Sequence, residues 1–484
     1  MEGGTSTEAR EDAMRMRTID GSEIDLPRDV FSAWRGRLRG PVLTSADAGY
    51  EDSRTVWNGM IDRHPAMIAR CLGTNDVIEC VRFARANNLL LCIKGGGHNI
   101  AGLAVADGAL MLDMSLMRGV WCDPSRRIAR AQAGCLLGEV DRETQVHGLA
   151  GVMGFISLTG AAGLTLGGGI GYLTRRWGWT ADNVAGMDVV TADGRLVRAC
   201  PDENSDLFWA LRGGGGNFGV VTGFDYVLHD VGPEMVGGAV AWPASDARGV
   251  LEMYRTLAEQ APRELTLVSL IRPAPAAPWL PTEWHGKPIV MLLACHTGRP
   301  DEGEKAVAPI KSWGKPIGDV LARRPYVQMQ SLLDATQPKG RRYYWKSEYL
   351  PRVEAALCDT MIEHASRIRS PYSSMILFQM EGALNELEAN HSPVGNRDAR
   401  YLLNIAAAWE RPEDDAEHME WARTTWSELR RFSTGGTYIN FLTEDEGAER
   451  MQAALGGALP RLAHVKTRWD PENFFRSNRN IRPD

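Results

Sequence analysis

The sequence predicts an α+β protein built from two lobes. The chain has 484 residues, and single hydrophobic cores rarely grow beyond about 250–300 residues, so we expect a second core. Residues 74–232 are rich in glycine and contain short apolar runs, which predict short strands joined by tight turns. From residue 233 to 436 the pattern changes to amphipathic and alternating segments, which predict helices packed on a sheet.

Three elements of the first lobe can be placed from the residues. Residues 76–87 carry apolar side chains at helical spacing, with Asn75 or Asp76 as the expected N-cap. Residues 89–93 are an unbroken apolar run, typical of a short buried strand. Residues 187–199 contain two apolar segments around an Asp-Gly pair, which predicts a β-hairpin.

The second lobe combines helices, strands and connectors. Helices are predicted over residues 245–260 and 351–366, and strands over 343–349 and 375–381. Residues 272–287 are rich in proline, which predicts an irregular connector between such elements.

These changes along the chain predict four parts. They are an N-terminal extension (1–49), a glycine-rich domain (50–232), a second domain (233–440) and a C-terminal segment (441–484). Within the last part, residues 447–462 predict a helix.

Composition excludes several classes of protein. The net charge of −7 argues against a general nucleic-acid-binding surface. No apolar run reaches the length of a membrane-spanning helix, and residues 1–17 form a polar tail without the apolar core of a secretory signal. None of the 8 cysteines forms a Cys-x-x-Cys pair, so we expect no metal site, and free thiols in a reducing cytoplasm.

The most informative motif is Lys-Gly-Gly-Gly-His-Asn at residues 94–99, directly after the predicted strand. Glycines at such a place let backbone N–H groups approach a bound anion closely. His98 would then present a nucleophilic imidazole beside that anion. The alternative is a surface loop with an incidental histidine.

Two further glycine clusters follow, at residues 167–171 and 213–219. The second contains Gly-x-Gly-x-x-Gly, but a dinucleotide fingerprint needs a strand before it and a helix after it. Here a predicted helix (205–211) precedes the cluster and a predicted strand (220–227) follows it, so a Rossmann site is disfavoured. Several glycine turns suit one extended anionic ligand better than a single phosphate.

With these pieces together, the chain resembles the berberine-bridge-enzyme-like family of FAD-linked oxidases. That family has an FAD-binding domain of the p-cresol-methylhydroxylase/vanillyl-alcohol-oxidase type. The resemblance implies this domain plus a substrate domain whose antiparallel sheet is covered by helices. The matching motifs extend over most of the chain and occupy residues 94–102, 159–171, 206–222, 438–441 and 469–481.

The resemblance also implies how FAD is held. His98 would be bonded to the flavin 8α-methyl group, and the backbone around it would hold the pyrophosphate. The turn at 159–169 would border the isoalloxazine and ribityl chain, and the C-terminal segment would close the pocket. The cofactor contacts carried over by position are Gly95, Gly96, Gly97, His98, Asn99, Gly102, Thr159, Gly160, Gly163, Leu164, Gly167, Gly168, Gly169, Gly219, Val221, Tyr438, Asn440, Asn478 and Asn480.

Two positions depart from the family pattern. Many members add a second covalent link through a cysteine, but Ile156 stands at that position, so we expect a single histidyl link and a small or medium substrate. Thr159 occupies a position near flavin C4a, where valine is common in oxidases. Its hydroxyl leaves open an oxygenase, in which Thr159 steers oxygen, beside the favoured ordinary oxidase.

The resemblance implies that catalytic groups face the flavin from the C-terminal segment. Residues 437–441 alternate, which predicts a strand with Tyr438 and Asn440 on one face. A free tyrosine has a pKa of about 10, so Tyr438 would need a nearby cation or hydrogen-bond donors to act as a base. The alternative is a structural tyrosine.

Other cleft residues are less specific. Glu388, which would share a strand face with Glu386, is the second choice for the base, because plant members use a carboxylate in this region. Tyr343 and Trp345 would form an aromatic wall or pack in the core.

The favoured function is a covalent FAD oxidase that takes a hydride from a CH–OH or CH–NH group of an alkaloid, polyketide or sugar and reduces O2 to H2O2. The alternatives are an oxygenase or dehydrogenase on the same scaffold, and a binding protein with a vestigial flavin site. The expected partners are the small-molecule substrate and O2, with no nucleic acid and no membrane. We expect a cytoplasmic monomer or homodimer.

Overall fold

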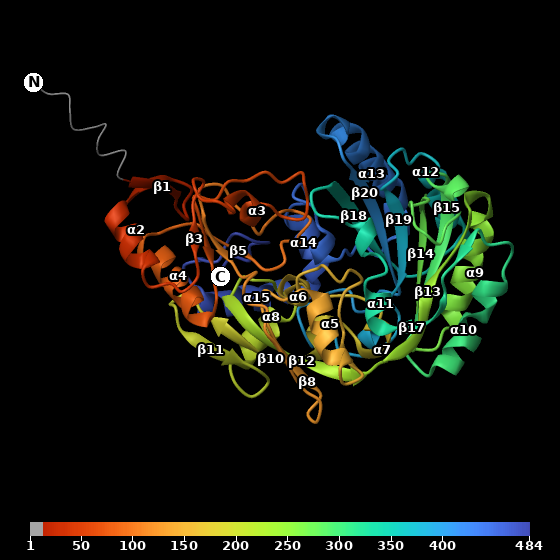
Figure 1. Ribbon diagram of the computed structural model, residues 1–484, viewed down its shortest axis with the longest axis horizontal. Helices are drawn as coiled ribbons and strands as arrows, with labels where there is room; N and C mark the ends of the chain where they lie inside the picture. The colour runs from red at the N-terminus through yellow and green to blue at the C-terminus, as the bar shows by residue number, and fades with distance from the viewer. Residues whose placement is uncertain (1–12) are drawn as a thin grey trace, which may run out of the picture.

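The computed structural model describes residues 13–484, which form two lobes lying side by side (Figure 1). The first lobe, on the left in Figure 1, contains three sheets, and the second is built on one large sheet. The mixture of helices and largely antiparallel sheets confirms the predicted α+β fold class.

The small sheet of the first lobe carries the His98 loop at the end of one strand. Its order is β3 (Val42–Leu43), β4 (Met67–Arg70), β6 (Leu110–Asp113) and β5 (Leu91–Lys94). Strand β6 pairs in parallel with both β4 and β5. Parallel strands need a crossover connection, and α4 (Thr74–Ala86) connects β4 to β5.

Helix α4 begins differently from the prediction. We expected Asn75 or Asp76 as its N-cap, but the helix begins at Thr74 and Gly73 is the cap residue. The buried Asp76 carboxylate instead accepts backbone N–H bonds from Arg39 at 3.0 Å, Gly40 at 3.1 Å and Leu72 at 2.9 Å. Asp76 therefore fixes a neighbouring loop rather than the helix end.

The second sheet of the first lobe is antiparallel throughout. Its order is β11 (Leu196–Ala199), β10 (Val184–Val190), β12 (Val220–Asp230), β8 (Ile128–Gln132) and β7 (Val120–Asp123), with β9 (Leu149–Gly151) beside β12. The predicted hairpin at 187–199 is confirmed by the β10–β11 pair. The other helices of this lobe are α2 (Arg28–Arg35), α3 (Tyr50–Arg54), α5 (Leu137–Gln145), α6 (Ala161–Leu166), α7 (Thr174–Trp177) and α8 (Ser205–Leu211).

The second lobe is an eight-stranded antiparallel sheet with helices on one face. The strand order is β16 (Gly318–Asp319), β13 (Glu234–Pro243), β15 (Pro288–His296), β14 (Leu265–Pro273), β19 (Ser374–Gln379), β20 (Tyr401–Trp409) and β18 (Arg342–Leu350), with β17 (Ala322–Pro325) beside β13. The helices on that face are α9 (Ala247–Gln260), α10 (Pro300–Ser312), α12 (Ala355–Ala365) and α13 (Asp415–Leu429), whereas the short α11 (Tyr326–Gln330) packs against α5 of the first lobe. Within residues 13–484, no helix has both the length and the apolar character to cross a membrane.

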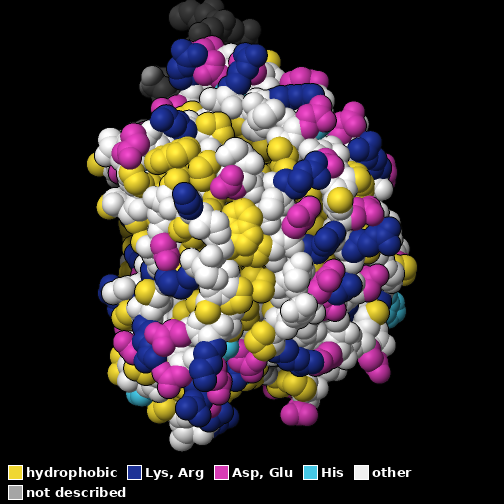
Figure 2. Space-filling model, turned by 90° about the vertical axis from the view of Figure 1, so that its right-hand side faces the viewer, with side chains coloured by type: hydrophobic (Ala, Val, Ile, Leu, Met, Phe, Trp, Pro, Cys, Tyr) yellow, Lys and Arg dark blue, Asp and Glu magenta, His cyan; other side chains and the backbone are white. Residues whose placement is uncertain are grey.

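The two faces of this sheet have different partners. Helices α9, α10, α12 and α13 bury one apolar face and form the outer side of the lobe. On that outer side, charged residues of both signs flank a central band of apolar side chains (Figure 2). The opposite face packs toward the first lobe, where Val268 and Phe378 share a cluster with Trp179 and Tyr438. The cleft described below opens along this second face.

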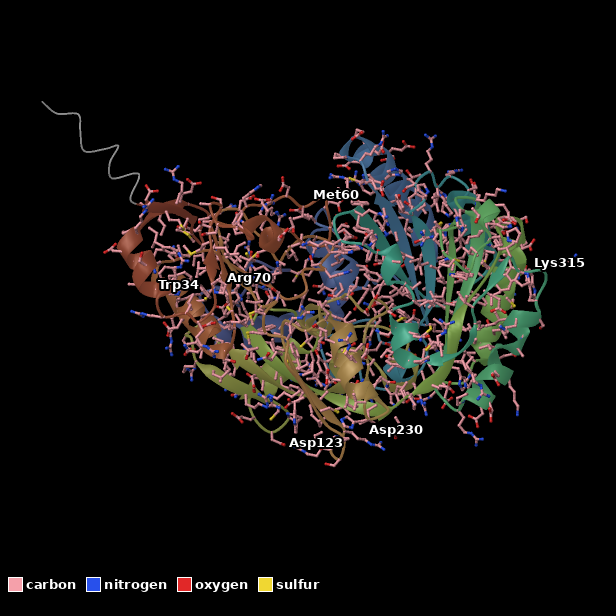
Figure 3. The ribbon with its side chains drawn as sticks, in the orientation of Figure 1. Trp34, Met60, Arg70, Asp123, Asp230 and Lys315 are labelled. Carbon is pink, nitrogen blue, oxygen red and sulfur yellow. The ribbon has the colours of Figure 1, made fainter. Side chains whose placement is uncertain are left out.

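Both ends of the described chain pack on the first lobe. Strands β1 (Ala13–Arg17) and β2 (Glu23–Pro27) pair with each other, so residues 13–17 are not the polar tail we expected, and residues 1–12 lie outside the described part. Helices α14 (Ala448–Leu455) and α15 (Leu459–Trp469) return to the first lobe, where Leu462 and Phe474 join its core (Figure 1). Met60 of the first lobe lies at the boundary and packs against the second-lobe core (Figure 3).

Two C-terminal predictions are wrong. Residues 437–441 form no strand, because the chain turns in a 3-10 helix at Ile439–Phe441. The single helix expected over 447–462 is two helices, α14 and α15, separated by the 3-10 turn Gly456–Ala458. Adjacent glycines favour such an interruption, because glycine loses more backbone entropy in a helix than other residues do.

Candidate active site

A cavity of about 360 Å³ lies between the two lobes. The His98 loop, the turn at 154–170, the third glycine cluster and the C-terminal segment line it from one side. Strands β14, β15, β18, β19 and β20 line it from the other. Segments that are far apart in the sequence thus meet at one cleft.

The loop after β5 brings His98 to this cleft. Gly96 packs so closely on Gly160 that an added Cβ would lie 2.5 Å from the Gly160 Cα, so no side chain fits there. The Asn99 side-chain oxygen accepts N–H bonds from Ala101 at 3.1 Å and Leu103 at 3.3 Å, which fixes the end of the loop. One side of the loop packs against the backbone of Gly160, and the other side faces the cavity.

The imidazole of His98 is half-buried, and one of its nitrogens is buried and unsatisfied. Its Nε2 atom has no hydrogen-bond partner among the residues that the structure describes. Burial lowers the pKa of His98 to about 4, so the ring is neutral at neutral pH. A neutral imidazole with an unused nitrogen is a competent nucleophile.

Tyr438 and Asn440 meet at the second glycine turn. The Tyr438 oxygen accepts hydrogen bonds from the Gly169 N–H at 3.1 Å and from Asn440 Nδ2 at 2.8 Å. Asn440 also donates to the Leu164 carbonyl at 3.2 Å. Tyr438 is 1% exposed, and its burial raises the pKa of the phenol. The lowered pKa that a base requires is therefore not present in this structure.

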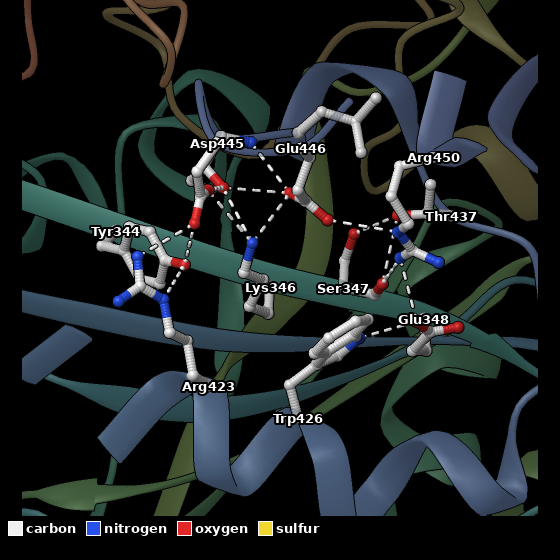
Figure 4. Close-up of polar contacts among 12 residues, drawn as sticks. Tyr344, Lys346, Ser347, Glu348, Arg423, Trp426, Thr437, Asp445, Glu446 and Arg450 are labelled. Carbon is white, nitrogen blue, oxygen red and sulfur yellow. Dashed lines mark hydrogen bonds and ion pairs between the residues drawn. The ribbon is translucent and has the colours of Figure 1, made fainter. Parts of the chain in front are cut away.

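Charged residues anchor the segment that carries Tyr438 (Figure 4). Glu348 on β18 is fully buried and forms an ion pair with Arg450 at 2.9 Å. Lys346, two residues earlier on β18, lies 3.2 Å from Asp445 and 3.5 Å from Glu446. These pairs hold residues 445–450 against the second lobe and so fix the turn at 439–441.

Comparison with known proteins identifies the family to which this chain belongs. Residues 65–199 match a family model described as an FAD binding domain, and residues 437–482 match one described as berberine and berberine like. The (R)-6-hydroxynicotine oxidase of Paenarthrobacter nicotinovorans is 30% identical over 460 residues, which cover 92% of this chain and 97% of the relative. The chain belongs to the berberine-bridge-enzyme-like FAD-linked oxidoreductases.

Solved structures agree with this membership. The structure of 6-hydroxy-D-nicotine oxidase from Arthrobacter nicotinovorans is 28% identical, with a TM-score of 0.83 over 92% of this chain and 98% of that one. Berberine bridge enzyme from Eschscholzia californica, 18% identical, has a TM-score of 0.84 over 94% of this chain and 99% of that one. The second likeness concerns the fold alone.

The cleft of this oxidoreductase fits FAD. An added Cβ at Gly163 would meet nothing within 4 Å, although Gly163 lines the cavity, so this turn leaves room for a ligand. The side-chain oxygen of Asn478 is buried without a partner among the described residues, while its Nδ2 donates to the Gly216 carbonyl at 3.2 Å. Cradling glycines and unpaired polar atoms are what an extended dinucleotide needs.

Most predicted contacts line the cavity. They are Gly95, Gly96, Gly97, His98, Asn99, Thr159, Gly160, Gly163, Leu164, Gly167, Gly219, Val221, Tyr438, Asn440 and Asn478. Gly102, Gly168, Gly169 and Asn480 do not line it, and Gly169 acts instead through its hydrogen bond to Tyr438.

The structure places Glu388 outside the cleft, contrary to its expected role as the second choice for the base. The stretch around it contains a 3-10 turn, Ala383–Asn385, instead of a strand, so strand alternation does not apply. Glu388 is exposed and outside the cavity lining, and Glu386 pairs with Arg263 on the surface. Of the predicted aromatic wall, Trp345 lines the cleft, whereas Tyr343 is buried under Trp57.

Sequence reasoning missed three polar residues on the second-lobe sheet. Arg272, Ser374 and Asn404 line the cavity from β14, β19 and β20. Arg272 falls at the start of the predicted proline-rich connector, although its side chain continues the set that Val268 and Leu270 place on one face of β14. That alternation was the signal that could have found it.

Proposed function

We propose that this protein is a covalent FAD-dependent oxidase. It would take a hydride from a CH–OH or CH–NH group of a small molecule, of alkaloid, polyketide or sugar type, and reduce O2 to H2O2. FAD supplies the two-electron acceptor chemistry when it is bound. The observation that carries the proposal is the neutral His98 ring at the glycine loop of the cleft, whose buried Nε2 has no hydrogen-bond partner among the described residues.

The proposed covalent link is single. Ile156 lines the cleft at the position where many family members have a cysteine. Among the described residues, no cysteine lines the cavity, and Cys135 is buried with its thiol directed to the Gly119 carbonyl. All eight cysteines are free, which also supports the proposed cytoplasmic location.

Tyr438 is the proposed contact to the reacting group of the substrate. No Asp or Glu is among the described residues that line the cavity, so Tyr438 and His98 are its acid–base groups besides the arginines. The raised pKa of Tyr438 keeps its proton at neutral pH, while two N–H donors occupy its oxygen lone pairs. Tyr438 is thus suited to donate a hydrogen bond to the reacting oxygen or nitrogen of the substrate, and the proton that a CH–OH group loses on oxidation passes to water.

One observation favours the second candidate, an oxygenase. Thr159 lines the cavity, and no hydrogen bond of its hydroxyl is found among the described residues. A free hydroxyl beside the expected flavin position is available to oxygen. A dehydrogenase that uses another electron acceptor fits the same scaffold.

The proposal is tested by anaerobic screening. Purified protein is mixed with a panel of alcohols, amines and sugars, and loss of the yellow flavin absorbance identifies a substrate. With air admitted, one H2O2 per substrate oxidised supports the oxidase. Incorporation of labelled oxygen from O2 into the product would favour the oxygenase, and turnover only with an artificial acceptor would favour the dehydrogenase.

A further inference from the structure

Three polar side chains interrupt the apolar sheet face that borders the cleft. Leu270 on β14 lies opposite Ile376 on β19, and Ile376 lies opposite Asn404 on β20. Arg272 follows Leu270 by two residues and Ser374 precedes Ile376 by two, so both lie on the same face as Asn404. We call Arg272, Ser374 and Asn404 the polar patch.

Arg272 has no counter-ion among the described residues. Its side chain is 7% exposed, and it donates only to backbone carbonyls, from Nε to Pro273 at 3.1 Å and from Nη2 to Pro371 at 3.3 Å. The charged neighbour that acts on it is Arg341, of like sign, and burial with this repulsion lowers the pKa of Arg272 to about 10. A buried cation without a partner is costly, because desolvation is not offset by an opposite charge.

The other arginine of the lining differs. Arg479 lies on the C-terminal segment, where it donates to the carbonyls of Glu446 at 3.0 Å and Leu442 at 2.7 Å. Acidic residues 444–446 lie near enough to oppose the effect of burial on its pKa. The uncompensated positive charge of the cleft is therefore at Arg272, on the substrate side.

Asn404 and Ser374 also have unused hydrogen-bonding capacity. Asn404 is 2% exposed, and its side-chain oxygen has no partner among the described residues. Ser374 is equally buried and lines the cavity, and its hydroxyl makes no hydrogen bond to the described residues. Buried polar atoms are satisfied in more than about nine cases in ten, so unpaired atoms on a cavity wall indicate a ligand.

We infer that the substrate carries an anionic oxygen, a carboxylate or a phenolate, that pairs with Arg272 and is flanked by Ser374 and Asn404. The side-chain oxygen of Asn404 accepts a hydrogen bond from a hydroxyl or amine group of the substrate that lies next to the anionic group. This inference rests on the proposed function only in taking the cleft as the substrate site.

The test measures ligand binding to the holoenzyme by titration calorimetry. Benzoate is compared with benzamide, its neutral isostere, and 4-nitrophenolate with 4-nitroanisole, at a pH where the phenol is ionised. At least one anion should bind about tenfold or more tightly than its neutral partner, as expected for a buried charge-assisted hydrogen bond. The pair that shows the preference distinguishes a carboxylate from a phenolate.

Variants assign the preference to the patch. Arg272→Gln should abolish it, Arg272→Lys should retain part of it, and the matched surface variant Arg263→Gln should leave it unchanged. Equal binding of anion and neutral partner to the unmodified protein would overturn the inference, even if Arg272→Gln failed to fold. So would a preference that persists in folded Arg272→Gln. If the anion preference is found but no compound bleaches the flavin, the oxidase proposal fails and the anion site stands.

Discussion

The indole of Trp57 stacks on the imidazole of His98, with ring centroids 4.4 Å apart and an angle of 19° between the planes. The other face of Trp57 stacks on Tyr343 of the second lobe at 3.6 Å. The indole N–H donates to the Gln337 carbonyl at 3.0 Å. The orientation of His98 is thus set from across the lobe boundary, which would hold its ring in place for the proposed bond to the flavin.

Replacing His98 should convert covalent flavin into dissociable flavin. His98→Ala removes the proposed nucleophile but leaves the glycine cradle, so the protein should still bind FAD. Acid precipitation and denaturing gel fluorescence should then find the flavin in the supernatant, whereas the unmodified protein keeps it in the pellet. His147→Ala, an exposed histidine, is the matched control and should keep its flavin bound. Acid-stable flavin in His98→Ala would refute the link.

The rate at which FAD becomes covalently attached to His98 should change little in mild acid. Only the neutral imidazole is nucleophilic, and an ordinary histidine with a pKa of about 6.5 is only ~3% neutral at pH 5. Burial lowers the pKa of His98 to about 4, so most of its rings are neutral at that pH. The rate of covalent FAD incorporation into apoprotein at pH 5 should therefore stay within about twofold of the rate at pH 8. A thirtyfold decrease would show an ordinary pKa.

Tyr438→Phe should have a modest kinetic effect. Removal of a general base costs about 10²–10⁴ in rate, but the raised pKa argues for a hydrogen-bond donor instead. We expect the rate of flavin reduction to fall by less than about tenfold, with the pH profile unchanged. Tyr349→Phe, also buried but outside the cavity lining, is the control. A fall above a hundredfold with loss of a pH limb would establish Tyr438 as the base.

The fold was more predictable than the local structure of residues 437–441. Glycine runs and hairpin signals are local, so the hairpin at 187–199 and the strand before His98 could be predicted from their own residues. Residues 437–441 alternate over too short a stretch to distinguish a strand from a turn. The structure resolves this ambiguity because no strand pairs with them and the chain turns there.

Arg272 illustrates a second limit of sequence reasoning. Its place at the end of β14, beside prolines, resembles the start of a loop. Whether its sheet face meets helices or the cleft depends on how the two lobes pack. That arrangement depends on contacts between distant segments, such as β18 and residues 445–450, which no local pattern shows.

Thr159→Val should separate the two oxygen chemistries. Valine nearly preserves the volume of threonine because a methyl group replaces the hydroxyl. For an oxidase, H2O2 yield per substrate should remain stoichiometric and the rate of flavin reoxidation should change by less than about threefold. Loss of labelled-oxygen incorporation in this variant would instead identify Thr159 as an oxygen-steering residue. Leu158→Ala, on an exposed neighbouring side chain, controls for disturbance of the turn.

The buried ammonium of Lys466 should contribute strongly to the docking of the C-terminal segment on the first lobe. Lys466 on α15 and Asp470, the residue that caps the C-terminal end of this helix, are fully buried and 2.6 Å apart. The Lys466 ammonium also donates to the carbonyls of Asn217 at 2.6 Å and Phe475 at 2.9 Å. Lys466→Met leaves the Asp470 carboxylate buried without its cation, so the free energy of unfolding should fall by about 3–5 kcal/mol in urea titrations.

Arg468→Met is the control for that variant, because Arg468 lies on the same helix and pairs with Asp206 at the surface. Its loss should cost at most about 1 kcal/mol. Adding Asp470→Asn to Lys466→Met should recover part of the stability, since the buried negative charge is then removed while an acceptor remains for the Phe474 and Phe475 N–H groups. Equal losses for Lys466→Met and Arg468→Met would show that apolar packing of α15, rather than the buried pair, holds the segment that brings Asn478 to the cleft.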